Sequence, residues 1–258
     1  MANQTYEVLL HLPPNTDFLF FVFFSTTCSY SFHWYLTPDS ETYHSPRLSW
    51  LNNNRNTHLV LFFIGLAGAA IYGIFLIQHW IWLVLAAIIT FLYSAPKIPH
   101  PWFRALRKVA LGKTIFLALV WMYITTILPV EISDMPWKID YSFFAAGRFF
   151  LIYSICILFD YRDREYDKSI GIRSLITWLS EKAITYLFTL SIVLFAIFTL
   201  LLLLYGYTYL SVFILLVPGI ITAIMYRRAT KNFSDMLYYF VLDGLMALSS
   251  FITLIPGI

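Results

Sequence analysis

The chain has 258 residues, of which 60% are hydrophobic and 12% are charged. An ordinary soluble domain carries about 25% charged residues, so the composition excludes a water-soluble globule and predicts an all-α, polytopic membrane bundle. The two cysteines lie in apolar runs and indicate neither a disulfide framework nor a metal site, and the formal net charge of +3 is distributed over loops, so no nucleic-acid partner is expected.

Apolar runs separated by charged breaks predict about eight transmembrane helices. Each run is close to the 20 or so residues that cross roughly 30 Å of hydrocarbon. The first run is predicted to be a retained span and not a signal peptide, because no basic segment precedes it. The predicted spans are 17–37, 57–77, 79–95, 114–131, 141–160, 182–204, 207–227 and 235–255.

The basic residues alternate from loop to loop. The loops 38–56, 96–113, 160–182 and 227–234 hold all but two of the 17 lysines and arginines. The positive-inside rule places these loops in the cytoplasm, and predicts an integral protein of the bacterial inner membrane whose active face is cytoplasmic. Of the two exceptions, Lys138 and Arg148, the second lies inside a span and is expected to extend its side chain toward the external surface.

Two similar halves are predicted within one transmembrane domain over residues 1–258. The first and the fifth spans each enter a long polar cytoplasmic loop, and four helices separate them. This spacing is typical of an internal duplication, with halves at about 1–131 and 132–258.

The run 160–167, at the end of the fifth span, carries the residues most suited to chemistry. At 100° per residue, Asp160, Asp163 and Asp167 lie within about 60° of one helical face. Carboxylates this close repel one another unless a cation lies between them, and hard oxygen ligands suit Mg²⁺. The spacing predicts a Mg²⁺–diphosphate site. The alternative is a solvated helix end where Arg164 and Lys168 pair with Asp160 and Asp163.

Two motifs resemble those of a known family. The pattern Asp-x-x-Asp-x-x-x-Asp, followed by Gly-Ile-Arg-Ser-Leu at 171–175, resembles the second aspartate-rich motif of the UbiA superfamily of intramembrane prenyltransferases. Ser174 stands where that family has threonine, and keeps the hydroxyl group. The run Tyr93-Ser-Ala-Pro-Lys97 is similar to the family's Tyr-x-x-x-Lys element.

This resemblance implies a UbiA-like bundle and a Mg²⁺-dependent transferase of alkyl groups other than methyl. Such an enzyme moves an isoprenyl group from a polyprenyl diphosphate to an aromatic or other lipophilic acceptor. The catalytic and metal-binding residues would be Asp160, Asp163 and Asp167, and the substrate diphosphate would be bound by Tyr93, Lys97, Arg104 and Arg164. Taken without the resemblance, Tyr93 is an interfacial aromatic residue and Lys97 a topology charge.

The chain also departs from the family. The first aspartate-rich motif, Asn-x-x-x-Asp-x-x-x-Asp, has no counterpart in the stretch 28–41, where His33 occupies its region. Asp39 and Glu41 lie nearby, but Pro38 separates them from the helix. The family has nine spans, and the segment 1–16 resembles the connection after a first helix, with 8–12 as its remnant.

Two other functions stay open. A non-catalytic or divergent UbiA-like protein would bind a lipid diphosphate or a protein partner, and the missing first motif favours this hypothesis. An unrelated transporter would need ionisable residues at several span midpoints, and Asp243 is the clearest of that kind.

Overall fold

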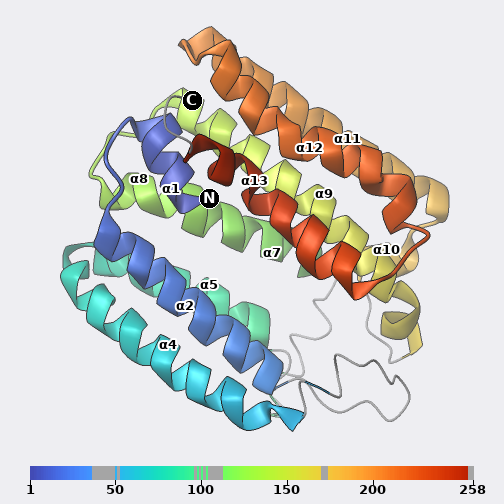
Figure 1. The fold of residues 1–258 in the computed structure, drawn as a ribbon, viewed down its shortest axis with the longest axis horizontal. Helices are drawn as coiled ribbons and strands as arrows, with labels where there is room; N and C mark the ends of the chain where they lie inside the picture. The colour runs from blue at the N-terminus through green and yellow to red at the C-terminus, as the bar shows by residue number, and fades with distance from the viewer. Residues whose placement is uncertain are drawn as a thin grey trace. The chain divides into compact units, whose positions relative to one another are not determined.

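Every regular element in the described part of the chain is a helix (Figure 1). The structure is a computed structural model, and it describes residues 1–36, 50, 53–95, 98, 100, 103, 113–169 and 174–254. Within a bilayer each backbone N–H and C=O group must find its partner inside the protein. Long apolar segments therefore fold as helices, and the predicted all-α class is confirmed.

Each of the eight predicted spans corresponds to a helical segment in the described part of the chain, with bounds that differ by a few residues. Seven helices in the described ranges are long and apolar enough to cross a membrane. The first predicted span is the 20-residue helix α2, whose serine, threonine and histidine residues leave it outside that set. The chain is a polytopic membrane bundle with seven such helices where about eight were predicted.

The bounds of the elements follow the chain order. They are α1 (Ala2–Gln4), η1 (Thr5–Leu10), α2 (Thr16–Tyr35), α4 (Arg55–Phe75), η2 (Ile77–His79), α5 (Trp80–Ser94), α7 (Lys113–Met122), η5 (Tyr123–Ile127), α8 (Leu128–Ile132), α9 (Ile139–Ser169), α10 (Leu175–Trp178), α11 (Glu181–Leu201), η6 (Leu202–Tyr205), α12 (Tyr209–Ala229), η7 (Met236–Leu242) and α13 (Asp243–Thr253). Of these, η1, η5 and η7 are π-helical, and η2 and η6 are 3₁₀-helical.

The chain forms two compact units. Unit 1 comprises Met1–Pro14 and Lys108–Ile258, and unit 2 comprises Asn15–Arg107. The predicted duplication into halves at residues 131 and 132 stays a prediction.

Helix α9 is the centre of unit 1. It packs against α7, α10, α11, α12 and α13 (Figure 1). Two-thirds of its membrane window is buried, compared with about a quarter to a third for α11 and α12. Because most of α9 is buried whereas its neighbours keep exposed apolar residues such as Ile224 of α12, the neighbours face the lipid and most of α9 does not.

The basic segments of unit 1 gather at one end of the bundle. Hydrogen bonds join the C-terminal end of α9 to the start of α7, to the start of α11 and to η7. At the opposite end, the hydroxyl group of Tyr207 donates to Asp140, in the first turn of α9. The alternation of basic and non-basic connections predicted this division of the helix ends.

Arg148 lies inside unit 1 and is only 6% exposed. Its Nη1 donates to Thr5 Oγ1 at 2.8 Å, to the carbonyl oxygen of Thr125 at 2.6 Å and to Thr126 Oγ1 at 3.1 Å. Its Nη2 donates to Gln4 Oε1 at 2.9 Å. The prediction that this side chain extends to the external surface was wrong, because four acceptors inside the bundle hold it there.

The first ten residues of the chain supply two of these acceptors. They form α1 and the π-helical η1, and Thr5 and Tyr6 are almost fully buried. This helical segment contacts η5, α8 and α13, and is longer than the remnant 8–12 that was expected. Arg148 therefore ties the segment to α9.

Unit 2 is built on the pairing of α2 with α4, which lie side by side in Figure 1. The pairing is close because α4 presents glycine at the contact: a Cβ atom built at Gly65 would lie 2.5 Å from the backbone nitrogen of Cys28. At Gly68 it would lie 2.3 Å from the ring of Phe24. Small residues allow such close approach of helices in membranes.

We predict that Gly65→Ala weakens unit 2. The added methyl group meets the backbone of α2, which cannot rotate away, so the two helices must separate at a cost of about 1–3 kcal/mol. The unfolding midpoint of the purified protein in detergent measures this loss. Gly73→Ala is the matched control on the same helix, because its Cβ would lie 3.6 Å from the Phe21 ring, an ordinary contact. Equal midpoints for the two variants would contradict the prediction.

Candidate functional site

The predicted site residues of unit 1 lie at the basic end of α9. This helix has 31 residues, about 46 Å at 1.5 Å per residue, and is therefore longer than a hydrocarbon core of roughly 30 Å. Carboxylates near a helix C terminus meet the partial negative charge of the last carbonyl groups. Asp160, Asp163 and Asp167 therefore need stabilising partners from outside the backbone of α9.

Asp160 is buried against α7. The hydroxyl group of Thr114, at the start of α7, donates to the carboxylate oxygen Oδ2 of Asp160, and both residues are nearly inaccessible. A hydrogen bond to an ionised carboxylate is stronger than a neutral one. This contact anchors the end of α9 to α7.

Asp163 is paired with the neighbouring Arg162. The guanidinium Nε and Nη2 donate to the two carboxylate oxygens at 2.7 and 3.1 Å, and Nη2 also donates to the hydroxyl oxygen of Tyr239 at 2.7 Å. The same guanidinium lies 5.3, 4.7 and 4.8 Å from the ring centres of Phe159, Tyr238 and Tyr239. Cation–π contacts of this kind fix the orientation of the arginine.

Arg164 is directed toward the start of α11. Its Nη1 donates to Glu181, and its Nη2 donates to the carbonyl oxygen of Leu179 at 2.7 Å. Lys168 bonds Glu165 at 2.8 Å. The alternative pairs predicted from helical spacing, Arg164 with Asp160 and Lys168 with Asp163, are therefore not formed, because Glu181 and Glu165 take the two cations.

Two guanidinium groups at this end keep buried donors without an acceptor among the described residues. These are Nη1 of Arg162 and Nε of Arg164. A buried donor left without an acceptor costs roughly 1–3 kcal/mol, and more when its group is charged. The basic end of α9 therefore has unused capacity to bind an anion.

The three aspartates do not form a ready metal site in the described part of the chain. No group of three or more histidine, cysteine, aspartate or glutamate side chains is placed there to hold a metal ion. Asp160 and Asp167 are buried, at 6% and 4% exposure, whereas the side chain of Asp163 is 41% exposed and bound to Arg162. Binding of Mg²⁺ by these three aspartates therefore stays a prediction.

Tyr93 belongs to unit 2 and is described within that unit. Its ring stacks on the ring of His33 with centroids 5.1 Å apart, and His33 Nδ1 lies 3.4 Å from the hydroxyl oxygen of Ser94. The sequence-based reasoning singled out Tyr93 and His33 separately, and the structure places them together. Lys97 and Arg104 lie outside the described residues.

A cavity of about 380 Å³ lies at the opposite end of α9. Lys138 and Asp140 line it from the start of α9, and Tyr207 and Thr208 from the turn before α12. Burial raises the pKa of the Tyr207 hydroxyl above its ordinary value, and the charge of Asp140 raises it further. Tyr207 therefore stays protonated and donates its hydrogen bond to Asp140 at neutral pH.

Comparison with known proteins assigned no family. No model of a protein family, no curated protein and no solved structure matched the chain.

The sequence-based reasoning did not identify Thr114, Arg162 or Tyr239 as part of this end of the bundle. From the sequence, Arg162 was interpreted only as one of the basic residues of a cytoplasmic loop. Its position next to Asp163 in the chain was the one feature that could have indicated their ion pair. Thr114 and Tyr239 are common residue types near predicted span ends. Their role depends on which helices pack against α9.

We predict that Thr114→Val destabilises unit 1. The substitution keeps the volume of the side chain but removes the donor to a buried carboxylate, at a cost of about 1.5–3 kcal/mol. The unfolding midpoint in detergent measures it. Thr189→Val is the control, since the exposed Thr189 hydroxyl group donates to the carbonyl oxygen of Thr185 on its own helix and to no other described residue. If the two variants unfold alike, Asp160 does not depend on Thr114.

Proposed function

We propose that this chain is a UbiA-like intramembrane prenyltransferase that binds an isoprenyl diphosphate at the basic end of α9. The observation that carries the proposal is the pair of guanidinium groups, Arg162 and Arg164, with buried donors lacking an acceptor among the described residues. Arginine is well suited to bidentate binding of phosphate. The aspartate spacing and its resemblance to the family's second motif support the same location.

The proposed reaction breaks the bond between the allylic carbon and the diphosphate oxygen. Diphosphate leaves with the electron pair, and the remaining allylic cation forms a new bond to a lipophilic acceptor, which then loses a proton. The role of Arg162 and Arg164 is to hold the leaving diphosphate and offset its charge.

Mg²⁺ belongs to this proposal as the expected cofactor and would supply charge neutralisation of the diphosphate. Asp160, Asp163 and Asp167 are its proposed ligands. Tyr93, Lys97 and Arg104 are proposed as diphosphate-binding residues on the family resemblance alone. The bacterial inner membrane, with the basic end of α9 in the cytoplasm, is the proposed location.

A second candidate is a UbiA-like protein that binds a lipid diphosphate, or a protein partner, without transferring anything. Two observations favour it. The described residues include no three-ligand metal cluster, and Asp163 is engaged by Arg162 through two hydrogen bonds. An unrelated transporter is the third candidate, and it would need ionisable residues at several span midpoints.

We predict that the detergent-purified protein, incubated with Mg²⁺, geranylgeranyl diphosphate and a panel of aromatic and lipid acceptors, releases diphosphate. Asp163→Asn should lower this release by about 100-fold or more, because it removes a proposed ligand of the Mg²⁺ that would offset the charge of the leaving diphosphate. Glu165→Gln is the control, since this exposed carboxylate is two residues away and, among the described residues, is bonded by Lys168 alone.

The outcomes separate the two candidates. No release above that of Asp163→Asn with any acceptor would overturn the transferase proposal. If labelled geranylgeranyl diphosphate still binds to the wild-type protein in that case, the non-catalytic candidate stands. If it does not bind, both fail.

A further inference from the structure

The buried guanidinium of Arg148 is not used by the proposed reaction. It lies twelve residues before Asp160 on α9, about 18 Å along the helix axis. Its four hydrogen bonds engage Nη1 and Nη2, and the acceptors are an amide, two hydroxyl groups and a backbone carbonyl group. Each of these acceptors is neutral.

No carboxylate in the described part of the chain forms a salt bridge with Arg148. The salt bridges found there join Arg162 to Asp163, Arg164 to Glu181 and Lys168 to Glu165. An arginine keeps its charge in proteins, and a charge in the interior of a membrane protein is expensive unless an opposite charge lies nearby. The neutral acceptors bind the N–H groups of Arg148 but leave its positive charge without a counter-charge.

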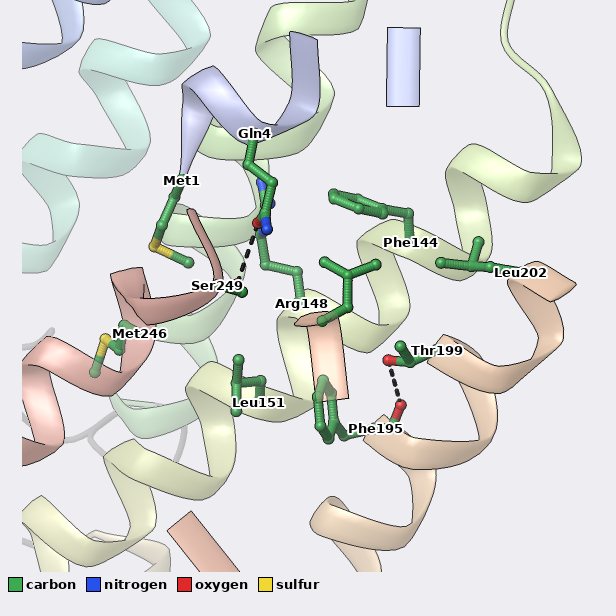
Figure 2. Close-up of a pocket in the computed structure, with 11 residues that line it drawn as sticks. Met1, Gln4, Phe144, Arg148, Leu151, Phe195, Thr199, Leu202, Met246 and Ser249 are labelled. Carbon is green, nitrogen blue, oxygen red and sulfur yellow. Dashed lines mark hydrogen bonds between the residues drawn. The ribbon is translucent and has the colours of Figure 1, made fainter. Parts of the chain in front are cut away.

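A small cavity of about 20 Å³ lies beside Arg148. Figure 2 shows Gln4, Arg148 and Ser249 together at its edge, with the hydroxyl group of Ser249 bonded to the amide oxygen of Gln4. The remaining lining is largely apolar and comes from α9, α11, α12 and α13, with Phe144 and Phe195 among it. Such a volume holds about one particle of the size of a water molecule.

Gln4 supplies an unused donor at this cavity. The residue is 1% exposed, and its amide nitrogen Nε2 has no hydrogen-bond partner among the described residues. Its amide oxygen is already occupied by Arg148 and Ser249. The open position therefore requires an acceptor and not another donor.

We propose that this cavity binds a monatomic anion of the size of chloride, held by the Gln4 amide nitrogen and the positive charge of Arg148. A water molecule would accept from Gln4 but would leave the arginine uncompensated. A carboxylate or phosphate group is too large for 20 Å³. The site is independent of the diphosphate site, and neither proposal depends on the other.

Thermal unfolding of the full chain in detergent tests the site. We expect sodium chloride or bromide to raise the midpoint above that in sodium gluconate of equal ionic strength by on the order of 2–4 °C. Gluconate is too large for the cavity. No difference between halide and gluconate would overturn the proposal.

The sharpest variant is Gln4→Glu. It keeps the acceptor for Arg148 Nη2 and replaces the amide donor by a negatively charged oxygen that repels an anion and offsets Arg148, so the protein should fold without halide and show no difference between chloride and gluconate. General salt effects act on both proteins alike, so the comparison with wild type isolates the bound ion. An undiminished halide effect in Gln4→Glu would overturn the proposal.

Two further measurements complete the test. Arg148→Met should also abolish the halide effect, whereas Arg227→Met, at an exposed position at the basic end, should leave it unchanged. Because Arg148→Met risks failing to fold, anomalous diffraction from bromide-soaked wild-type crystals gives an independent readout. A bromide peak within hydrogen-bond distance of Gln4 Nε2 supports the site, and an empty cavity in bromide contradicts it.

Discussion

The packing of unit 1 depends on Arg148, whose guanidinium group remains charged inside an apolar bundle and needs hydrogen-bond acceptors there. Arg148 obtains acceptors from the first helical segment and from η5, two elements far apart in the sequence. The backbone acceptor, Thr125, lies in the π-helical η5, and π-helical turns depart from the usual backbone pairing and often occur at functional positions. The charge thus requires irregular backbone around it.

The same arginine sets how α9 is rotated. With Arg148 turned toward Gln4 and Thr5, Asp160 is directed about 120° away from it around the helix. That direction leads to α7, where Thr114 binds Asp160. On other sides of the helix, Arg162 reaches Tyr239 and Arg164 reaches Glu181. The rotation of α9 that turns Arg148 toward its buried acceptors is therefore consistent with the direction in which each charged group at the end of α9 points.

The basic end of α9 is a network of paired charges in this structure and not an open carboxylate cluster. A diphosphate at this end would compete with Asp163 for the guanidinium of Arg162. Release of Asp163 would free a carboxylate at the same place where an anion had bound. In the proposed function, this exchange couples binding of the substrate to exposure of a candidate metal ligand.

Length and hydropathy determined the helices. The predicted spans 57–77 and 182–204 correspond to Arg55–Phe75 and Glu181–Tyr205, because the lack of water in a bilayer leaves an apolar segment few alternatives to a helix. The loop charges likewise predicted which ends of the unit 1 helices gather together. These properties depend on residues near one another in the chain, so the sequence alone is sufficient for them.

Only the tertiary structure decided the partners of the buried charges. Helical spacing predicted that Arg164 pairs with Asp160, whereas Glu181, 17 residues further along, takes Arg164. Spacing also placed three carboxylates on one face, but Arg162 binds Asp163 and Thr114 binds Asp160. Arg148 was expected to reach the surface, and acceptors from Gln4 to Thr126 keep it inside. A side chain's partner depends on which helices pack together, and periodicity along one helix carries no information about its neighbours.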